Sequence, residues 1–526
     1  MDWAKAPQRR EQLVLFPTRL DDAVGEDHVV RLLDEILARV DWSAWEATYD
    51  LTRGQPPIRP RVKAGVILYG LLTKIRTTRL LEEAQLVRID FMWLAEGRQI
   101  DHTTISKFRV KNAEKLKDLF VQVGLVAREM QWLKLESLAF DGTRIRANNR
   151  RSGTRTPERL RELKAELAAR FVELEEKIAT ADARDEALLG DCALAELNKD
   201  LADAGQRIKK LDAALAEIER MEQAEETLPK RLPITDPQSR VTPNKDGGYA
   251  PNYTPLATVD VDSGLIVSAD VIPHTDEDKH LMTAIEDVQK SFGLDNPPAE
   301  MLADGMMATG ENLAECEERN ITLYSPIDDG PADNPALRDD PTVPVAAEDR
   351  DRLPTKTTKS QGQESVKLDK HAFVYDEEND CYWCPEGKRL SFVSTIHETR
   401  NGRERVRHQY KSDAADCDEC PLRELCLSGK SRRRDIRHEQ HEPHSLRQRE
   451  RMRTEEAQQK YARRRHPGER PFAVIKQQFG ARQFLTRGIE RVKQEWLWLA
   501  TAFNLKQLFG LIRSGADPPG ACCENV

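Results

Sequence analysis

The sequence lacks any apolar run that approaches membrane-spanning length, which argues against a transmembrane protein. The stretch from Met1 to Arg10 also lacks the apolar region of a secretory signal peptide, so we expect a cytoplasmic protein. Nine cysteines in that reducing compartment are not expected to form disulfides. Two roles remain for them, metal binding or burial as free thiols.

The chain also lacks an overall positive charge, since its formal net charge is -9 over 526 residues. That average does not indicate a nucleic-acid-binding protein, but it hides a separation of charge. Acidic residues are concentrated in 182–226 and 328–351, whereas 432–493 is strongly basic. Phosphate groups respond to local charge, so DNA binding is not excluded. The length is sufficient for about two to four domains.

Helical spacing of apolar residues dominates the N-terminal part. It predicts helices over 29–45, 62–74 and 78–89, and a further helix that begins near Asp101, whose carboxylate is suited to cap it. Four polar residues of this last helix are expected to point outward: Thr103, Thr104, Lys107 and Arg109. In a helix-turn-helix arrangement these residues would contact DNA. An ordinary helical bundle with a solvated face is the alternative.

Two further kinds of segment follow. In 157–221, leucines and isoleucines step by three and four between charges, which predicts an antiparallel helical hairpin or coiled coil with a break near Gly190. Beyond Pro233 the period changes to two. The expected elements are a β-hairpin over 252–261 and 265–272, a helix over 277–292, a strand over 301–304, a helix over 309–319 and a strand over 321–327. This order is typical of a mixed α/β fold.

Three acids lie in settings that suggest a site. Asp141 lies in a Phe-Asp-Gly stretch between an apolar run and an alternating run, and Asp304 lies in an Ala-Asp-Gly stretch. Aspartate is depleted inside strands, so the presence of each of these two aspartates in a predicted strand needs an explanation. A bulge or turn at Asp141-Gly142 is one reason, and metal ligation is another. Glu469 opens a helical segment, and three such acids suit a two-metal phosphoryl-transfer site.

Several motifs stand in a fixed order along the chain. They are Tyr69-Gly70, Arg79 to Glu83, Asp101 to Arg109, Phe140 to Asn148, Met301 to Gly305, Gly310 to Leu313, Phe472 to Lys476 and Gly480 to Gly488. Together they resemble the DDE transposases of bacterial insertion sequences, in the branch with a helical N-terminal domain and a cysteine-bearing insertion. The resemblance covers nearly the whole chain apart from the predicted helical hairpin and the C-terminal tail.

The resemblance implies a ribonuclease-H-like catalytic core in which Asp141, Asp304 and Glu469 bind two Mg²⁺ ions, with Mn²⁺ as an alternative. The ions would activate water to nick DNA at the element ends, and then the freed 3′-hydroxyl to attack target DNA. The basic residues implied to hold DNA are Arg465, Lys476, Arg482 and Arg487. Double-stranded DNA is the implied partner, together with a second copy of the chain on it, because two ends must be brought together.

The chain departs from the family pattern near these acids. Met306 and Met307 replace an aromatic pair, Arg470 to Ala473 replaces the motif that commonly follows the Glu, and Tyr461 lies one residue further from that Glu. Glu490 and Glu495 are rival third acids, although both lie beyond the matching stretch. Two other functions stay open. One is a nuclease that cuts without joining, and the other is an inactive or repurposed sequence-specific DNA-binding protein.

The cysteines form a second candidate site. Cys381 and Cys384 make one Cys-x-x-Cys pair, Cys417 and Cys420 make another, and Cys426 follows closely. Such paired elements are typical of zinc sites, although an iron-sulfur cluster also takes four thiolates and unligated burial is a third possibility. The match to the family's insertion favours Cys384, Cys417, Cys420 and Cys426 as Zn²⁺ ligands. The metal would be structural.

A basic run precedes the candidate Glu. It comprises Lys430 to Arg434, Arg447, Arg449, Arg451, Arg453 and Arg463 to Arg465. A charge run is usually a solvated face, but beside a phosphoryl-transfer site we interpret this one as a surface that carries DNA.

The sequence therefore predicts an α/β protein with a mixed-sheet core and three additions. The expected divisions are a helical DNA-binding domain over 1–130, core segments over 131–155 and 233–328, a helical hairpin over 156–232, a linker over 329–375, a cysteine-rich insertion over 376–430, a basic segment with the C-terminal helical part of the core over 431–514, and a disordered tail over 515–526. Within the linker, 328–370 is rich in proline, aspartate and threonine and is expected to be a loop or disordered.

Overall fold

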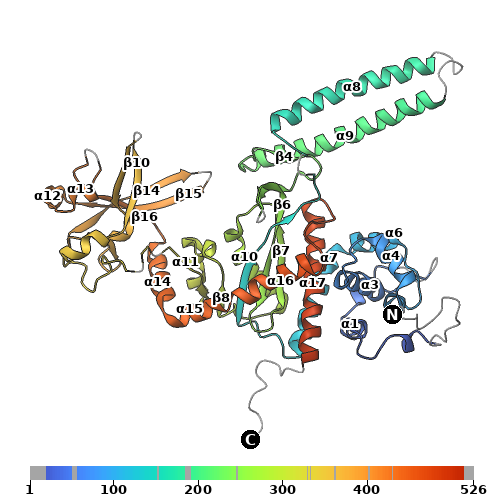
Figure 1. The fold of residues 1–526 in the computed structure, drawn as a ribbon, viewed down its shortest axis with the longest axis horizontal. Helices are drawn as coiled ribbons and strands as arrows, with labels where there is room; N and C mark the ends of the chain where they lie inside the picture. Colours follow the sequence, from blue (N-terminus) through green and yellow to red (C-terminus); the bar gives the residue numbers. More distant parts are fainter. Residues whose placement is uncertain are drawn as a thin grey trace, which may run out of the picture.

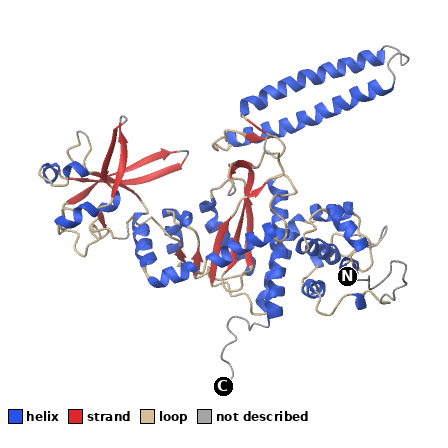
Figure 2. Ribbon diagram, in the orientation of Figure 1, coloured by secondary structure: helices blue, strands red, loops and turns tan. Residues whose placement is uncertain are grey.

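The computed structural model has a central sheet flanked by three other parts: N-terminal helices, a projecting helical hairpin and a separate sheet (Figures 1 and 2). The structure describes residues 19–49, 56–150, 153–183, 191–244, 247–328, 330–331, 333–360, 363–400, 403–428 and 431–514. The predicted tail over 515–526 lies outside these residues. Within the described residues, no helix combines the length and apolar character needed to span a bilayer.

The N-terminal part is helical, as predicted. Its elements are η1 (Asp21–Ala23), α1 (Val29–Ala38), α2 (Ser43–Glu46), α3 (Pro60–Leu72), α4 (Thr78–Val87), α5 (Ile89–Leu94), α6 (His102–Lys111) and α7 (Ala113–Glu129). The helix expected over 29–45 is divided, because the Asp41 carboxylate accepts from Ser43 N at 2.9 Å and begins α2. Asp101 caps α6 as predicted, by accepting from the backbone of Thr103 and Thr104. Helix α7 was not anticipated.

The central sheet joins strands from distant parts of the chain. Its strands are β1 (Ser137–Gly142), β2 (Ile145–Arg146), β5 (Arg240–Pro243), β6 (Tyr249–Asp260), β7 (Ile266–Ile272), β8 (Glu300–Leu302) and β9 (Thr322–Tyr324). Strand β6 pairs antiparallel with β1, β2, β5 and β7, whereas β1, β8 and β9 run parallel to one another. The mixed α/β order predicted from the sequence is therefore confirmed.

Helices cover this sheet and continue its hydrophobic core. They are η2 (Glu277–His280), α10 (Leu281–Phe292), η3 (Gly305–Met307), α11 (Gly310–Glu318), α16 (Arg465–Gln477) and α17 (Ile489–Ser514). Helix α17 packs on α3, α7 and β7, so one hydrophobic core joins the sheet to the N-terminal helices. Trp496 Nε1 donates to the carbonyl of Leu256 at 3.0 Å, which ties α17 to β6.

The predicted helical hairpin is present. Helices α8 (Pro157–Ala183) and α9 (Asp191–Gln223) lie side by side and project from the molecule (Figure 1). The short strands β3 (Thr154–Arg155) and β4 (Leu232–Pro233) pair at its base. Leu160, Leu211 and Ile218 belong to a small core of its own. The break predicted near Gly190 lies outside the described residues.

A separate sheet with its own core follows β9. It contains β12 (Val374–Asp376), β13 (Cys381–Trp383), β14 (Arg389–Arg400), β15 (Arg403–Ser412) and β16 (Asp435–Glu439) in that order. The other elements here are η4 (Ala347–Arg352), the hairpin β10 (Thr355–Ser360) and β11 (Gln363–Leu368), η5 (Lys370–Ala372), α12 (Ala414–Asp418), α13 (Arg423–Cys426), α14 (Glu442–Arg453) and α15 (Glu455–Ala462).

The structure corrects the prediction of a featureless loop over 328–370. This segment forms β10 and β11, and Ala336, Val345, Leu353 and Leu368 pack into the core of the separate sheet. Widely spaced apolar side chains gave no periodic signal in the sequence, yet each one reaches the same small core. We call the part of the chain over 333–439 the insertion.

Candidate active site

The register of two parallel strands brings Asp141 and Asp304 to the same level. Ala139 in β1 pairs with Leu302 in β8, and each aspartate lies two residues further along its strand direction. Neighbouring strands are about 4.8 Å apart, so the two backbones deliver adjacent carboxylates at the ends of β1 and β8. Both residues are half-buried. The sequence predicted these acids, but only the register brings them together.

The strand carrying Asp141 does not turn there. Asp141 pairs with Ala257 and Gly142 with Leu256 in an unbroken antiparallel register with β6. Thr143 N then donates to the carbonyl of Pro255 at 2.9 Å. The alternative of a bulge or turn at Asp141-Gly142 is therefore wrong.

Gly142 has a packing role of its own. A Cβ placed on this glycine would lie 2.2 Å from Glu277 Oε2, so only glycine leaves room for the Glu277 carboxylate. Glu277 is buried and lies beside the strand end that carries Asp141. The sequence analysis treated Glu277 only as the start of a helix. An acid next to a glycine of a distant strand has no signature in the sequence.

Helix α16 places Glu469 beside the same strand end. A Cβ on Gly468 would lie 3.6 Å from Asp141 Oδ2, so the helix meets that carboxylate closely. Glu469 and Lys476 are about two turns apart and share a helical face. Lys476 Nζ donates to Thr143 Oγ1 at 2.6 Å, so this face is turned toward the strand of Asp141. The Glu469 side chain is exposed.

The three acids are not gathered at metal-binding distance in this conformation. Arg464 Nη2 lies 3.3 Å from Asp141 Oδ1, and both side chains are largely buried. Asp304 Oδ1 accepts from Met306 N at 2.9 Å and caps η3. Within the described ranges, no group of three or more histidine, cysteine, aspartate or glutamate side chains is arranged to hold a metal ion. An arginine thus neutralises the position that the sequence assigned to an ion.

Of the two rival third acids, Glu495 has a structural role. Its carboxylate pairs with Arg76 at 2.7 Å and accepts from Leu485 N, Thr486 N and Thr486 Oγ1. Glu490 is exposed in the first turn of α17. Neither lies against Asp141 in the way that α16 does.

The predicted DNA-binding residues of α6 differ in their surroundings. The hydroxyl groups of Thr103 and Thr104 donate to the Asp101 carboxylate at the start of the helix, and Lys107 is exposed. Arg109 does not point outward as predicted, because Nη1 donates to the Arg76 carbonyl at 3.4 Å and the side chain lies under α17. Helical periodicity alone did not reveal this partner.

The predicted DNA-binding residues near Glu469 are mostly at the surface. Arg465 is exposed at the start of α16, and Arg482 and Arg487 are exposed on the loop over 480–488. Arg482 also donates to Gln477 Oε1 at 2.5 Å, and Arg487 donates to the Asn148 carbonyl at 3.1 Å. This loop is held against the chain that follows Asp141, since Phe484 N donates to the carbonyl of Arg146 at 2.9 Å.

Many arginines of the basic run make internal contacts. Arg447 pairs with Glu317 and Glu377, and Arg463 pairs with Asp262. Further examples are Arg432 with Asp418, Arg434 with the carbonyls of Cys426 and Leu368, and Arg449 with Glu442. Arg432 and Arg463 stay exposed within their ion pairs, so the interpretation of this run as a surface that carries DNA stays a prediction. Lys430 lies outside the described residues.

Four cysteines of the insertion line one small cavity. They are Cys384, Cys417, Cys420 and Cys426, the four favoured by the sequence, whereas Cys381 is buried in β13 away from it. Burial raises the pKa of Cys384 and Cys420 and raises that of Cys426 to about 12, with the other thiols of the cluster adding to the effect for Cys426. Burial therefore favours the protonated thiol at Cys384, Cys420 and Cys426.

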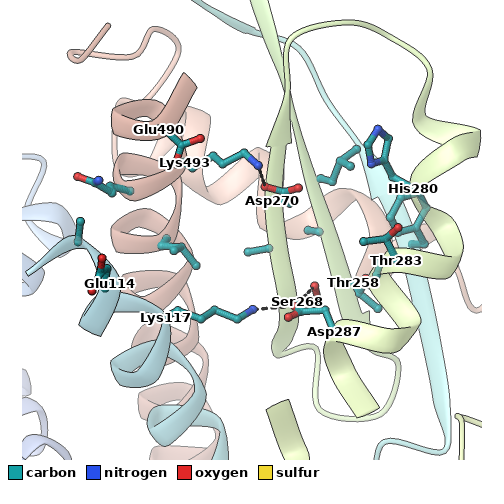
Figure 3. Close-up of a pocket in the computed structure, with 18 residues that line it drawn as sticks. Glu114, Lys117, Thr258, Ser268, Asp270, His280, Thr283, Asp287, Glu490 and Lys493 are labelled. Carbon is teal, nitrogen blue, oxygen red and sulfur yellow. Dashed lines mark hydrogen bonds and ion pairs between the residues drawn. The ribbon is translucent and has the colours of Figure 1, made fainter. Parts of the chain in front are cut away.

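A cavity of about 410 Å³ is lined by residues of β7, α7, α10 and α17 (Figure 3). Phe140 also lines it, and because neighbouring strand residues point to opposite faces, Asp141 faces the other side of the sheet. The charged residues around it pair with one another, Lys493 with Asp270 at 2.9 Å and Lys117 with Asp287 at 2.6 Å. These pairs tie α17 and α7 to β7 and α10, so we interpret this cavity as a join between elements.

Two family models match the chain. A transposase domain, DUF772, matches residues 18–111, which hold η1 and helices α1 to α6. A transposase DDE domain matches residues 383–509, which hold most of the insertion sheet, Glu469 and much of α17. A search of curated proteins finds no match. Transposase domains therefore match near both ends of the chain, which indicates a transposase and is consistent with the DDE type found in insertion sequences.

Proposed function

We propose that this transposase cleaves DNA at the ends of an insertion sequence in a Mg²⁺-dependent reaction and joins the freed 3′-hydroxyl to target DNA. The observation that carries the proposal is the parallel register of β1 and β8, which delivers Asp141 and Asp304 side by side, with α16 packed against Asp141. Glu469 on that helix supplies the third acid. Carboxylates that separate elements bring to the same strand end suit phosphoryl transfer by two ions.

The order of the central strands supports a ribonuclease-H-like core. Strand β1 has the antiparallel β6 and β7 on one side and the parallel β8 and β9 on the other. The first and second aspartates then come from the central strand and its parallel neighbour. The resemblance in the sequence implies a ribonuclease-H-like core that holds these acids, and this strand order supports that proposal.

The donor atoms fit magnesium, which prefers carboxylate oxygens and keeps several waters. Asp141, Asp304 and Glu469 would hold the ions, and bound Mg²⁺ would stabilise the charge on the attacking and leaving oxygens. The residues of this chain have separate tasks. Gly468 leaves space at the Asp141 carboxylate, and Lys476 and the exposed Arg465 lie where they can hold a DNA phosphate beside it.

In this proposal, Arg464 supplies the positive charge next to Asp141 when no ion is bound there. The arginine stabilises the half-buried carboxylate while the acids are apart, since an unpaired buried charge is costly. A bound ion would replace that arginine as the positive charge next to Asp141. Arg464 would then be able to contact DNA phosphate beside the exposed Arg465.

We further propose that Cys384, Cys417, Cys420 and Cys426 bind one structural Zn²⁺. Four sulfur donors that face one small cavity fit a tetrahedral zinc site. The raised pKa values of Cys384, Cys420 and Cys426 mean that the ion would displace protons on binding. Cys381 is not needed as a ligand.

DNA is the proposed partner of the exposed basic residues. Lys107 on α6, and Arg482 and Arg487 on the loop over 480–488, would contact its backbone, whereas Thr103 and Thr104 lie at the start of the same helix. A homodimer or larger assembly on DNA would bring two element ends together. The hairpin of α8 and α9 projects far enough from the sheet to serve as its contact (Figure 1). The site of action would be the bacterial cytoplasm, at the nucleoid.

One observation favours a second candidate function, sequence-specific DNA binding without catalysis. Asp141 is already neutralised by Arg464, and Glu469 is exposed rather than turned onto the aspartates. A protein fixed in this conformation would bind DNA but would not cut it.

The test uses purified protein and labelled DNA that carries the flanking sequence of the gene. Nicking and joining are measured with Mg²⁺ and with EDTA in the native protein, Glu469→Gln and the matched control Glu490→Gln, whose exposed acid lies on α17. We expect metal-dependent joining in the native protein and the control, and none in Glu469→Gln. Cutting without joining would favour a nuclease, and binding without cleavage would favour the second candidate.

A further inference from the structure

A pocket of about 200 Å³ opens where the N-terminal helices meet α17 and the loop over 480–488. Six of the residues that line it are arginines or carry hydroxyl groups: Arg76, Thr78, Ser106, Arg109, Thr486 and Arg491. We call it the Arg109 pocket. Its walls come from both matched transposase domains, over 18–111 and 383–509. It is separate from the three acids.

Arg109 is a buried charged group of this pocket with few partners. Its Nη1 donates to the Arg76 carbonyl at 3.4 Å, which is a long contact, and among the described residues its buried Nε has no hydrogen-bond partner. Burial lowers the pKa of Arg109 to about 10, although Glu495 opposes that effect. A buried guanidinium donor without an acceptor is costly, so an acceptor from a ligand would be stabilising.

The neighbouring charges are already used and cannot supply that acceptor. Glu495 receives Arg76, two backbone amides of the loop and the hydroxyl of Thr486. Arg76 itself also donates to the carbonyls of Gly480 and Gln483, each at 2.9 Å. Because Arg76 and Glu495 cancel, Arg109 and Arg491 leave the pocket with a net positive charge. The pocket is therefore built for an anion.

The mouth of the pocket adds groups suited to phosphate. Thr78 is the first residue of α4, and a helix N-terminus favours negative charge. Ser106 and Arg491 are exposed at the rim, where an approaching ligand can reach them. Arginine binds phosphate oxygens through its planar fork, so a tetrahedral oxyanion matches both guanidinium groups.

We propose that the Arg109 pocket binds a phosphate group of the DNA backbone, held by Arg109, Arg491 and the first turn of α4. The proposal rests on the proposed function in one respect, the identity of the ligand as DNA. It adds a phosphate contact that spans the two matched domains. Bound DNA would thus contact both the N-terminal helices and the C-terminal part of the core and stabilise their association.

The pocket lies within reach of the same DNA duplex as the acids. The loop that forms one wall pairs through Phe484 with Arg146, on the strand that continues from Asp141. The chain from Asp141 to Arg146 spans roughly 17 Å at strand rise. This corresponds to about five base pairs along B-DNA, whose strands carry a phosphate every 3.4 Å or so. The loop that forms this wall and Asp141 thus lie within the span of a short duplex, and in this proposal one duplex contacts both places.

The test measures DNA affinity against salt concentration by fluorescence anisotropy, for the full-length native protein, Arg109→Gln, Arg491→Gln and the control Arg39→Gln. Arg39 is an exposed arginine directly after the last residue of α1 and does not line the pocket. Each pocket variant is expected to bind about tenfold more weakly at moderate salt, because a charged hydrogen bond is lost. Each is also expected to lower the slope of log affinity against log salt by about 1, as loss of a phosphate contact does. Arg39→Gln is expected to match the native protein.

Two further measurements distinguish a loss of phosphate binding from a failure to fold. Arg491 is exposed, so Arg491→Gln decides the matter if Arg109→Gln fails to fold. Thermal unfolding with inorganic phosphate shows whether the pocket takes a free anion. Native affinity and slope in both variants would overturn the proposal and leave the proposed function intact. Stabilisation by phosphate with unchanged DNA binding would overturn the DNA assignment. No DNA binding by the native protein would instead contradict the proposed function.

Discussion

The acid site and the cysteine cavity are two candidate metal centres that the molecule supports in different ways. Asp141 and Asp304 lie at the ends of strands embedded in the main hydrophobic core, so strand register fixes their spacing without an ion. The four cysteines lie in the insertion, whose core is small and separate. The fold thus positions the two aspartates by itself, whereas we expect the insertion to depend on the proposed Zn²⁺ for its stability.

The largest expected effect is a loss of DNA joining, without a loss of stability, when an acid of the site is replaced. Asp304→Asn should lower DNA joining by about 10³-fold or more, because an ion ligand and its charge are lost. Its unfolding temperature should stay near the native value, since an amide oxygen can still cap Met306 N. Joining assays and thermal unfolding measure the two quantities. Asp295→Asn, which alters an exposed aspartate, is the control; a large loss of stability in Asp304→Asn would contradict the comparison.

The cysteine cavity should behave in the opposite way. Cys426→Ser is expected to release zinc and to make proteolysis of the insertion at least about tenfold faster, because metal binding is coupled to folding. Cleavage within the central sheet should not change. Limited proteolysis and metal analysis measure these effects, with Cys381→Ser as the control because that thiol does not line the cavity. Zinc retained by Cys426→Ser but lost from Cys381→Ser would refute the ligand assignment.

A smaller effect, on the free energy of unfolding, tests whether contacts within the protein stabilise the part of the molecule that carries the acid site. Glu495→Gln breaks the buried pair with Arg76, whose side chain is 11% exposed, and should lower the free energy of unfolding by about 3 to 5 kcal/mol. Glu490→Gln, at an exposed position of the same helix, should change it by less than about 0.5 kcal/mol. Chemical denaturation measures both. Equal effects would show that this pair does not hold the N-terminal helices to α17.

The smallest expected effect is a dependence on pH confined to the insertion. Burial lowers the pKa of His438 from 6.5 to about 4, so the fold favours the neutral imidazole. Its contribution to stability is present above pH 6.5 and is lost as pH falls toward 4, by up to about 3 kcal/mol. Hydrogen exchange should accelerate in β15 and β16 before it does in β1. His438→Gln should abolish this difference; persistence of it would assign the effect to another group.

Local sequence patterns predicted many of the helices and strands, but little of how these elements pack against one another. The capping carboxylate of Asp101, the helical hairpin and the strands around Asp141 follow from spacing that a few neighbouring residues reveal. The sheet of the insertion did not follow, because its strands are polar and its apolar residues are far apart in sequence. Secondary structure was therefore easier to predict from the sequence than tertiary packing.

The candidate site shows the same limit. Asp141 and Asp304 were selected because an acid inside a strand needs a reason, but their shared level depends on the register of β1 and β8. The pairing of Arg464 with Asp141 joins residues far apart in the chain, as does the approach of Glu277 to Gly142. Arg109 was predicted at the surface because periodicity does not identify what covers a helix.

The most direct measurement of the central claim is metal rescue of cysteine variants. Cleavage of end DNA is compared in Mg²⁺ and in Mn²⁺ for Asp141→Cys, Asp304→Cys and Glu469→Cys, with Glu490→Cys as the control. Thiolate binds softer ions better than Mg²⁺, so we predict no cleavage in Mg²⁺ and restored cleavage in Mn²⁺ for all three, with the control active in both. Full cleavage in Mg²⁺ by any of the three variants would contradict the account, because that acid would not be an ion ligand.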